Sequence, residues 1–258
     1  MTWKEKLHPT QYIGITEAGE VAFDLSVFDR LYIGNIIITK RLTTKLIEKL
    51  VEQKDRIILH LTCTGMGGSR VEPLVPTVTQ TIQKYTQLIA SGFPFKQVVL
   101  RIDPIIPTEK GILSAIEVIK QFKQNELLKE EERLPERIRY SVLDMYPHVI
   151  KRFNEAGFPI PYNTFHAPDQ ARQNVRQKLL EISKEMGFDL EACAEPGLIP
   201  TPCISQKDID ILGLTNTIIL TGRAGQRKTC GCPANKHELL NGTPHKCSNG
   251  CVYCFWKD

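Results

Sequence analysis

The sequence predicts an α/β fold, in the form of a partial TIM-like barrel of about six parallel strands with helices on its outside. Short apolar runs rich in β-branched residues alternate with longer stretches of helical periodicity across residues 34–220. Several of these runs are continuously apolar, which is typical of strands covered on both faces. Alternation of strands and helices indicates parallel strands joined by right-handed crossovers.

Six segments are candidate strands. They cover residues 34–39, 56–62, 97–102, 137–142, 189–193 and 217–220. This number fits a partial barrel better than a closed barrel of eight strands. A doubly wound sheet is the alternative, because periodicity does not determine the order of the strands.

Four segments place apolar side chains at helical intervals and are the candidate outer helices. They cover residues 43–53, 77–91, 112–124 and 168–186. The charge-rich residues 123–136 are interpreted as a solvated helix end and loop.

The two ends of the chain differ from its middle. Within residues 1–33, two short apolar runs flank a turn at Gly19, which predicts a hairpin that caps the barrel. Residues 221–258 are rich in Gly, Pro, Asn and Cys, and a bound metal centre would supply the order that their few apolar residues do not. We expect residues 1–33, 34–220 and 221–258 to pack as a single domain.

Composition restricts the classes of protein to consider. The chain has 258 residues, of which 41% are hydrophobic, enough for one domain with a sizeable core. A formal net charge of +4 is too mild to indicate nucleic-acid binding. Neither a membrane-spanning apolar run nor a signal peptide is recognisable, so we expect a cytoplasmic protein without a membrane partner.

The eight cysteines are concentrated late in the chain, with six of them after residue 200. A reducing cytoplasm disfavours structural disulfides, so clustered cysteines indicate a metal site or catalysis. Cys247, Cys251 and Cys254 form a C-x3-C-x2-C motif, with Tyr253 before the last cysteine. Three thiolates can hold a four-iron cluster while one iron stays open for catalysis. The alternative is a zinc site with His245 or another cysteine as the fourth ligand.

The motif C-x3-C-x-aromatic-C resembles the signature of the radical S-adenosylmethionine superfamily. This resemblance implies a [4Fe–4S] cluster on Cys247, Cys251 and Cys254, S-adenosylmethionine at the open iron, and an external electron donor of the flavodoxin or ferredoxin type. Such enzymes cleave S-adenosylmethionine reductively to a 5′-deoxyadenosyl radical, which abstracts hydrogen from the substrate.

The superfamily usually carries its motif after the first barrel strand. A motif near the C-terminus instead resembles the bacterial and phage family called domain of unknown function 1848, over most of the chain beyond about residue 30. The likeness includes residues 62–73, 98–107, 192–195 with Cys203, and 230–232. Parts of the first two segments also resemble spore photoproduct lyase, a radical enzyme that repairs DNA.

Cys193, Cys203, Cys230 and Cys232 are candidates for a second metal site, because four thiolates would close a structural site. The ligand would be an auxiliary [4Fe–4S] cluster or zinc, and the alternative is that these thiols are simply buried. Cys63 is interpreted as a packing residue.

Several residues are candidates for binding the cofactor. Gly67 and Gly68 follow the second predicted strand, where the resembled superfamily holds the methionine amino group, and Glu72 is a possible polar partner. A simple turn is the alternative. Arg101 and Asp103 share one face of the third predicted strand, where they would bind a carboxylate and a hydroxyl or amine. They could instead form a network with each other.

Ser141 ends the fourth predicted strand and is a candidate contact for the cofactor carboxylate, because α/β folds collect ligands at such ends. Glu195 either acts on the substrate or cofactor ribose or caps a loop. We do not expect His166 or His237 to be ligands.

Tyr253, Phe255 and Trp256 are expected to shield the cluster from water. The sequence therefore favours a radical S-adenosylmethionine enzyme acting on an unidentified small molecule or on a nucleobase or DNA. A non-enzymatic zinc or iron–sulfur module that binds a protein or nucleic acid is the competing class, and a two-cluster electron carrier is a third. The glycine-rich segment and the Arg101/Asp103 pair count against a docking module, and the large α/β body counts against an electron carrier.

Overall fold

A computed structural model describes residues 11–126, 128, 133–224, 228–240 and 247–256 of the chain. Within these residues the chain forms one sheet of seven parallel strands in the order β6-β5-β4-β3-β2-β1-β7. The strands are β1 (Ile13–Ile15), β2 (Gly34–Thr39), β3 (Ile57–Thr62), β4 (Val98–Ile105), β5 (Arg137–Val142), β6 (Asp189–Ala192) and β7 (Lys236–Glu238).

The order of the strands supports a partial barrel. From β1 to β6 each strand pairs with the next one along the chain, so the sheet winds in one direction, whereas a doubly wound sheet reverses its order. The described sheet has β6 at one edge and β7 at the other, and therefore stays open. Seven strands are present where about six were expected.

The helices are α1 (Thr44–Glu52), α2 (Val78–Ala90), α3 (Glu109–Gln124), α5 (Pro147–Glu155), α6 (Asp169–Met186) and α7 (Gln206–Ile211). The four predicted helices are confirmed as α1, α2, α3 and α6. Both α1 and α2 begin at a threonine whose side chain accepts a backbone N–H of the first turn. The charge-rich segment lies partly outside the described residues.

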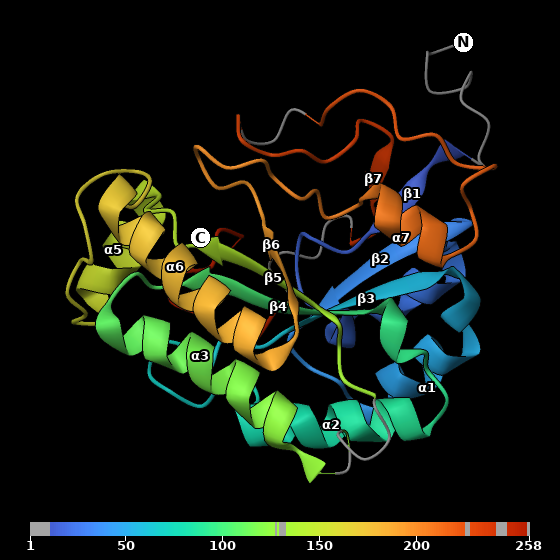
Figure 1. Cartoon of the computed structure of the whole chain (residues 1–258), viewed down its shortest axis with the longest axis horizontal. Coiled ribbons are helices and arrows are strands. Elements are labelled where there is room, and N and C mark those ends of the chain that lie inside the picture. The colour runs from blue at the N-terminus through green and yellow to red at the C-terminus, as the bar shows by residue number, and fades with distance from the viewer. Residues whose placement is uncertain (1–10, 127, 129–132, 225–227, 241–246, 257–258) are drawn as a thin grey trace.

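The two faces of the sheet bury different groups. Helices α1, α2, α3 and α6 follow one face (Figure 1), and their apolar side chains form the larger core with residues such as Leu59 and Leu100. The other face carries Ile36, Ile58 and Val99, and it is covered by α7 and by coil from the last third of the chain. No described helix is long and apolar enough to cross a membrane.

Two expectations for single segments are wrong. The N-terminal segment is not a hairpin, because β1 joins the sheet parallel to β2 and Val21–Phe23 forms a 3₁₀ turn capped by Glu20. Residues 217–220 are not a strand either. Ile218 is buried while Ile219 is 73% exposed, and the carbonyl of Ile219 accepts the side-chain amide of Asn235.

The segment after residue 220 is also more than a loop region. It contributes β7, which pairs with β1 through the register Ile13↔Lys236 to Ile15↔Glu238. The first and last described strands therefore lie side by side, which brings residues of the late segment over the carboxyl ends of the central strands (Figure 1).

Candidate active site

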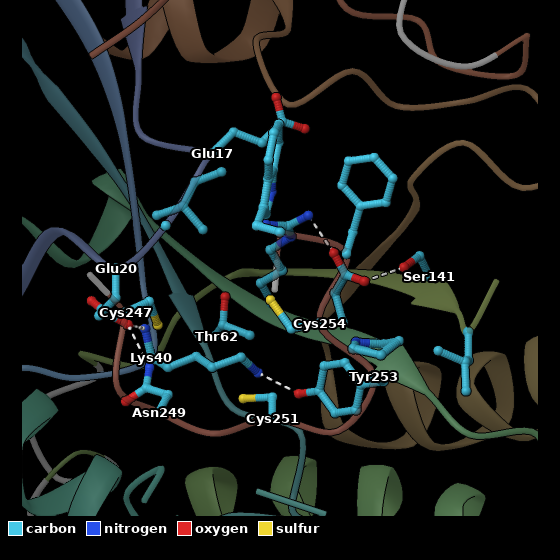
Figure 2. A pocket seen from close by; sticks show the side chains of 18 of the residues that line it. Glu17, Glu20, Lys40, Thr62, Ser141, Cys247, Asn249, Cys251, Tyr253 and Cys254 are labelled. Atoms are coloured by element: carbon cyan, nitrogen blue, oxygen red, sulfur yellow. Dashed lines mark hydrogen bonds and ion pairs between the residues drawn. The ribbon is translucent and has the colours of Figure 1, made fainter. Parts of the chain in front are cut away.

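A cavity of about 360 Å³ lies at the carboxyl ends of the strands. Lys40 follows β2, Thr62 ends β3, Asp103 lies on β4 and Ser141 on β5, and all four line this cavity (Figure 2). Parallel α/β sheets bind ligands at this edge, and the volume is in the range of small-molecule sites.

The three late cysteines surround one part of this cavity. Cys247, Cys251 and Cys254 all line it, and Figure 2 shows their thiols near Lys40 and Thr62. The cysteines are close enough that negative charge on Cys247 or Cys254 raises the pKa of Cys251. The sequence motif therefore becomes a spatial cluster that faces a hollow.

Backbone hydrogen bonds attach the cysteine loop to the loop after β3. The N–H of Val252 donates to the carbonyl of Val71 at 3.0 Å, and the N–H of Leu74 donates to Asn249 at 3.3 Å. Gly250 has φ 71°, and a Cβ there would lie 3.1 Å from Cγ of Pro73. A glycine is needed at this position because the conformation is left-handed and the neighbouring chain is close.

A second attachment comes from α5. Nε of Arg152 donates to the carbonyl of Val252 at 2.9 Å, and its Nη2 donates to the carbonyl of Cys254. A guanidinium presents its donors in a rigid fork, so one side chain fixes both ends of the C-x2-C segment.

A buried ion pair lies beneath the cysteines. The side chain of Glu72 has no exposed surface, and Nζ of Lys40 lies 2.8 Å from its Oε1. The hydroxyl of Tyr253 also donates to Glu72, and the hydroxyl of Thr64 donates to Oε2 at 2.6 Å. Because a buried carboxylate needs such partners, this network joins β2, the loop after β3 and the cysteine loop.

The electrostatics of the cavity favour thiols until a metal binds. Burial raises the pKa of Cys251 to about 12, although the ammonium of Lys40 acts in the opposite direction. Burial also raises the pKa of Cys247. Burial acts to lower the pKa of Lys40, but Glu72 and Cys251 outweigh it and the pKa is raised. A bound metal would replace the thiol protons, so we expect metal binding to release protons here.

Glu20 is a buried carboxylate beside the cysteine loop. Its oxygens accept the hydroxyl of Thr39 and the N–H of Lys40 at 2.8 Å, and the side-chain amide of Asn249 lies 3.3 Å away. Burial raises the pKa of Glu20 despite these donors. Asn249 also contacts Arg41 at 3.3 Å, so it connects the cysteine loop to the end of β2.

Arg101, Asp103 and Ser141 are brought together as the sequence suggested. The guanidinium of Arg101 pairs with Asp103, and the hydroxyl of Ser141 donates to the same carboxylate. Burial acts to lower the pKa of Arg101, but Asp103 outweighs it and the pKa is raised. The buried Nε of Arg101 has no hydrogen-bond partner within the part of the chain that the structure describes. The trio is therefore a network of paired polar groups on the wall of the cavity.

Gly67 and Gly68 do not lie with the other residues that were predicted to bind the cofactor. Gly67 lies against the carbonyl of Pro76, where a Cβ would come within 1.9 Å, and Gly68 donates its N–H to the carbonyl of Glu72 at 3.0 Å. Among the described residues that line the cavity, neither glycine appears, nor does Glu72. Their visible role is to shape the loop that positions the Glu72 carboxylate.

Four other cysteines form a separate buried group. Sγ of Cys193 lies 3.9 Å from Sγ of Cys203. The N–H of Cys203 donates to Sγ of Cys232 at 3.2 Å, and the N–H of Cys232 donates to Sγ of Cys230 at 3.5 Å. All four belong to the smaller core, on the face of the sheet opposite the main helices.

The remaining candidates lie around the rim or away from it. Glu195 is buried and accepts the N–H of Val142 at 2.7 Å, as a loop cap does, and burial raises its pKa to about 7. Nδ1 of His166 lies 2.7 Å from Oδ1 of Asp144. His237 is in β7 and contacts aromatic rings.

Aromatic side chains gather at the mouth of the cavity. Phe255 lies 4.7 Å from Tyr146 and 5.0 Å from Trp256 between ring centroids. All three line the cavity, as does Tyr253. Cys63 is buried within the larger core, which agrees with a packing role.

Among the described residues, no group of three or more His, Cys, Asp or Glu side chains is already arranged to hold a single metal ion. The two cysteine groups therefore differ from a finished mononuclear site. A four-iron cluster binds each thiolate at a different iron, so its ligands do not converge on one point.

The family model described as Domain of unknown function (DUF1848) matches residues 30–256. The chain belongs to this family. The match includes all eight cysteines and every strand except β1. No curated protein matches the chain.

Several residues of the site were not identified from the sequence. Glu17 and Glu20 line the cavity but precede the part that the family model matches. Lys40 directly follows a predicted strand, so its position at a carboxyl end was a usable signal. Nothing in the local pattern marks Asn249, because its role depends on contacts with residues more than 200 positions away.

Proposed function

We propose that this chain is a radical S-adenosylmethionine enzyme whose [4Fe–4S] cluster is held by Cys247, Cys251 and Cys254. The observation that carries the proposal is the placement of these three thiols around one cavity at the carboxyl ends of a parallel sheet. A docking module or an electron carrier has no need of such a cavity.

The residues present fit the proposed cluster. Three of the described lining residues are cysteines, so a four-iron cluster would keep one iron without a protein thiolate. When bound and reduced, the cluster would supply the electron that cleaves S-adenosylmethionine to methionine and a 5′-deoxyadenosyl radical, which abstracts hydrogen from the substrate. Lys40 carries positive charge next to Cys247 and Cys251 and would favour their thiolates.

Arg101, Asp103 and Ser141 form the polar wall of the proposed cofactor site. The guanidinium of Arg101 suits the carboxylate of the methionine moiety, and Asp103 suits its ammonium, because both residues line the cavity. Ser141 would hold Asp103 in place through its hydroxyl. In this proposal Gly67, Gly68 and Glu72 act indirectly, by shaping the loop that supports Tyr253 and Lys40.

The aromatic rings at the mouth of the cavity suggest which class of substrate binds there. They would also exclude water from the cavity. Phe255 is 47% exposed and Phe165 is 43% exposed, and both stack edgewise or tilted against Tyr146. Such rings can stack on a planar base, which supports a nucleobase or DNA substrate. A flavodoxin or ferredoxin in the cytoplasm would be the electron donor.

The test is anaerobic reconstitution with iron and sulfide, reduction with dithionite and addition of S-adenosylmethionine. We expect about four irons per chain and release of 5′-deoxyadenosine. Cys251→Ala should abolish both iron binding and release of 5′-deoxyadenosine, because the cluster would lose one of its three thiolate ligands. Cys63→Ala is the matched control, since it also removes a buried thiol but lies outside the cavity.

The same experiment separates the competing explanations. Zinc bound to the three cysteines with a fourth protein ligand, and no cleavage of S-adenosylmethionine, would overturn the proposal in favour of a binding module. Nucleotides and DNA added to the active enzyme should change its rate of cofactor cleavage. If they neither bind nor change that rate, the nucleobase part of the proposal is wrong.

A further inference from the structure

Four of the buried thiols outside the cavity form one group, whose size and location are unusual. Cys193, Cys203, Cys230 and Cys232 are each at most 5% exposed, and they occupy the inner side of the half-barrel. Their sulfurs and backbone amides are linked in a chain of contacts from Cys193 through Cys203 and Cys232 to Cys230. Contact between two sulfurs is ordinary packing, but a continuous chain of four buried thiols needs another explanation.

The four thiols come from three segments of coil, which are not paired with one another as strands. Cys193 follows β6, Cys203 precedes α7, and Cys230 with Cys232 lies on the coil before β7. Among the described residues, the hydroxyl of Thr229 donates across these segments to the carbonyl of Ala194 at 2.7 Å. Ala194 itself has φ 55°, a left-handed conformation that is costly for a residue other than glycine. The chain is thus turned sharply directly after Cys193.

The spacing of the sulfurs favours a single ion over a cluster. In a tetrahedral zinc site with Zn–S bonds of about 2.3 Å, neighbouring sulfurs lie roughly 3.8 Å apart. The separation of 3.9 Å between Sγ of Cys193 and Sγ of Cys203 is close to that edge length. A four-iron cube attaches its thiolates to four different irons and spreads them further apart.

The surroundings are suited to thiolate ligands. The backbone N–H groups of Cys203 and Cys232 donate to neighbouring sulfurs, as they do around metal-bound thiolates. Arg101 and Arg139 are close enough to attract negative charge on Cys203. Two cationic side chains near a buried site would offset the net negative charge that four thiolates leave on a zinc ion.

We propose that Cys193, Cys203, Cys230 and Cys232 bind one Zn²⁺ ion in a closed structural site. The ion would join the end of β6 to the segments before α7 and β7, and so hold the late part of the chain against the inner face of the sheet. Soft thiolates select zinc among the divalent metals available to a protein, and four ligands leave no position open for catalysis. This proposal does not depend on the proposed radical activity.

To bind zinc, the four thiols must move slightly closer together around one point. The thiols are arranged as a chain, and the described residues do not yet form a finished shell around one point. Cys230 and Cys232 are separated by Gly231 alone, in a coil that can adjust without moving a helix or strand. Zinc binding would thus stabilise the fold by the free energy of coordination.

The experiment measures metal content by mass spectrometry in a variant that lacks the other site, Cys247→Ala/Cys251→Ala/Cys254→Ala. We expect about one zinc and no iron per chain. X-ray absorption at the zinc edge of the same protein should show four sulfur ligands at about 2.3 Å. This measurement needs no substitution in the proposed site, so it does not depend on how well such variants fold.

Substitutions then assign the ligands. Cys230→Ala/Cys232→Ala should lose the zinc, whereas Cys63→Ala, which removes an equally buried thiol, should keep it. If the triple variant contains about four irons and no zinc, the site is an auxiliary cluster and the zinc assignment is wrong. If it contains neither metal, the four thiols are packing residues. Neither outcome bears on 5′-deoxyadenosine formation by the unmodified enzyme, so the two proposals fail separately.

Discussion

Glu72 shows how one buried residue supports the candidate site. Its carboxylate has no exposed surface, and its partners are Lys40, Thr64 and Tyr253. Tyr253 belongs to the cysteine motif, so the ion pair beneath the motif also orders the loop that carries it. Such a pair adds little net stability when complete, but removal of one partner leaves a buried charge unpaired.

We expect Lys40→Met to lower the free energy of unfolding by on the order of 3 kcal/mol, because Glu72 would lose its cation. Denaturant unfolding of the metal-free protein measures the effect. Lys49→Met is the matched control, since Lys49 pairs with Glu52 on the surface, where both side chains are more than 40% exposed. Its effect should stay below about 0.5 kcal/mol. Equal effects of the two substitutions would contradict the role given to the buried pair.

Glu195 gives a prediction about pH. Burial raises the pKa of this carboxyl to about 7, so the folded protein holds a proton that the unfolded chain releases at lower pH. Stability from this group is therefore complete at acidic pH and is lost as the pH rises towards 7 and beyond. The loss is at most about 3 kcal/mol, because each unit of pKa shift corresponds to about 1.4 kcal/mol.

Glu195→Gln should remove this dependence while keeping an oxygen for the N–H of Val142. The unfolding free energy of the variant minus that of the unmodified protein should therefore increase between pH 5 and pH 8 by up to about 3 kcal/mol. Urea unfolding across this range measures the difference. Glu181→Gln, on the exposed side of α6, should show no such increase. A difference that is constant with pH would show that Glu195 is ionised throughout.

Residue types and spacing identified part of the candidate site in advance. The motif of Cys247, Cys251 and Cys254 is local, so its members had to lie near one another. Arg101 and Asp103 were predictable because strand alternation places them on one face. Glu20 and Asn249 were not predictable, because each acquires its role from partners that only the fold brings near.

At the level of elements, α5 connects the sheet to the cysteine loop. It begins with Pro147 at its first turn, and Arg152 reaches from its last turn to the carbonyls of Val252 and Cys254. The helix therefore positions the loop without contributing a ligand. The hydrogen bonds carry charge on the donor, and such bonds contribute more than neutral ones.

Arg152→Gln should loosen the loop that spans Cys247 to Cys254. If about 2 kcal/mol of hydrogen bonding is lost, hydrogen exchange at the amides of Val252 and Cys254 should accelerate by about thirty-fold. Mass spectrometry of peptides from the metal-free protein measures this rate. Lys151→Gln, one position earlier and 75% exposed, should leave it unchanged. Faster exchange in both variants would indicate a general loosening of α5.

The elements that sequence reasoning found are those with strong internal patterns. Strands β2, β3 and β5 are buried along their whole length and β4 along most of it, and helices α1, α2, α3 and α6 have clear apolar sides. Strands β1 and β7 have three residues each, too few for a pattern, and they exist because they pair with each other and with β2. Helix α7 did leave a signal, since Ser205 and Asp208 form a capping box.

Across the whole molecule, alternation of strands and helices was enough to predict a parallel α/β sheet of the partial-barrel type. It was not enough to predict that the first and last segments of the chain contribute the strands β1 and β7 to the sheet. Residues 217–220 were assigned to a strand because β-branched apolar residues favour strands. In the described part of the fold these residues pair with no strand, and the place beside β1 is taken by β7 instead. Pairing partners, which are a property of the whole chain, decided the outcome.

The position of the three cysteines after β7, the last described strand, has a consequence for the order in which the protein is assembled. During translation the strands from β1 to β6 leave the ribosome well before Cys247, Cys251 and Cys254. A nascent chain can therefore assemble most of its sheet while it still lacks the thiols that would capture iron. If these thiols hold the proposed cluster, it can be assembled only after most of the scaffold that would enclose it has been synthesised.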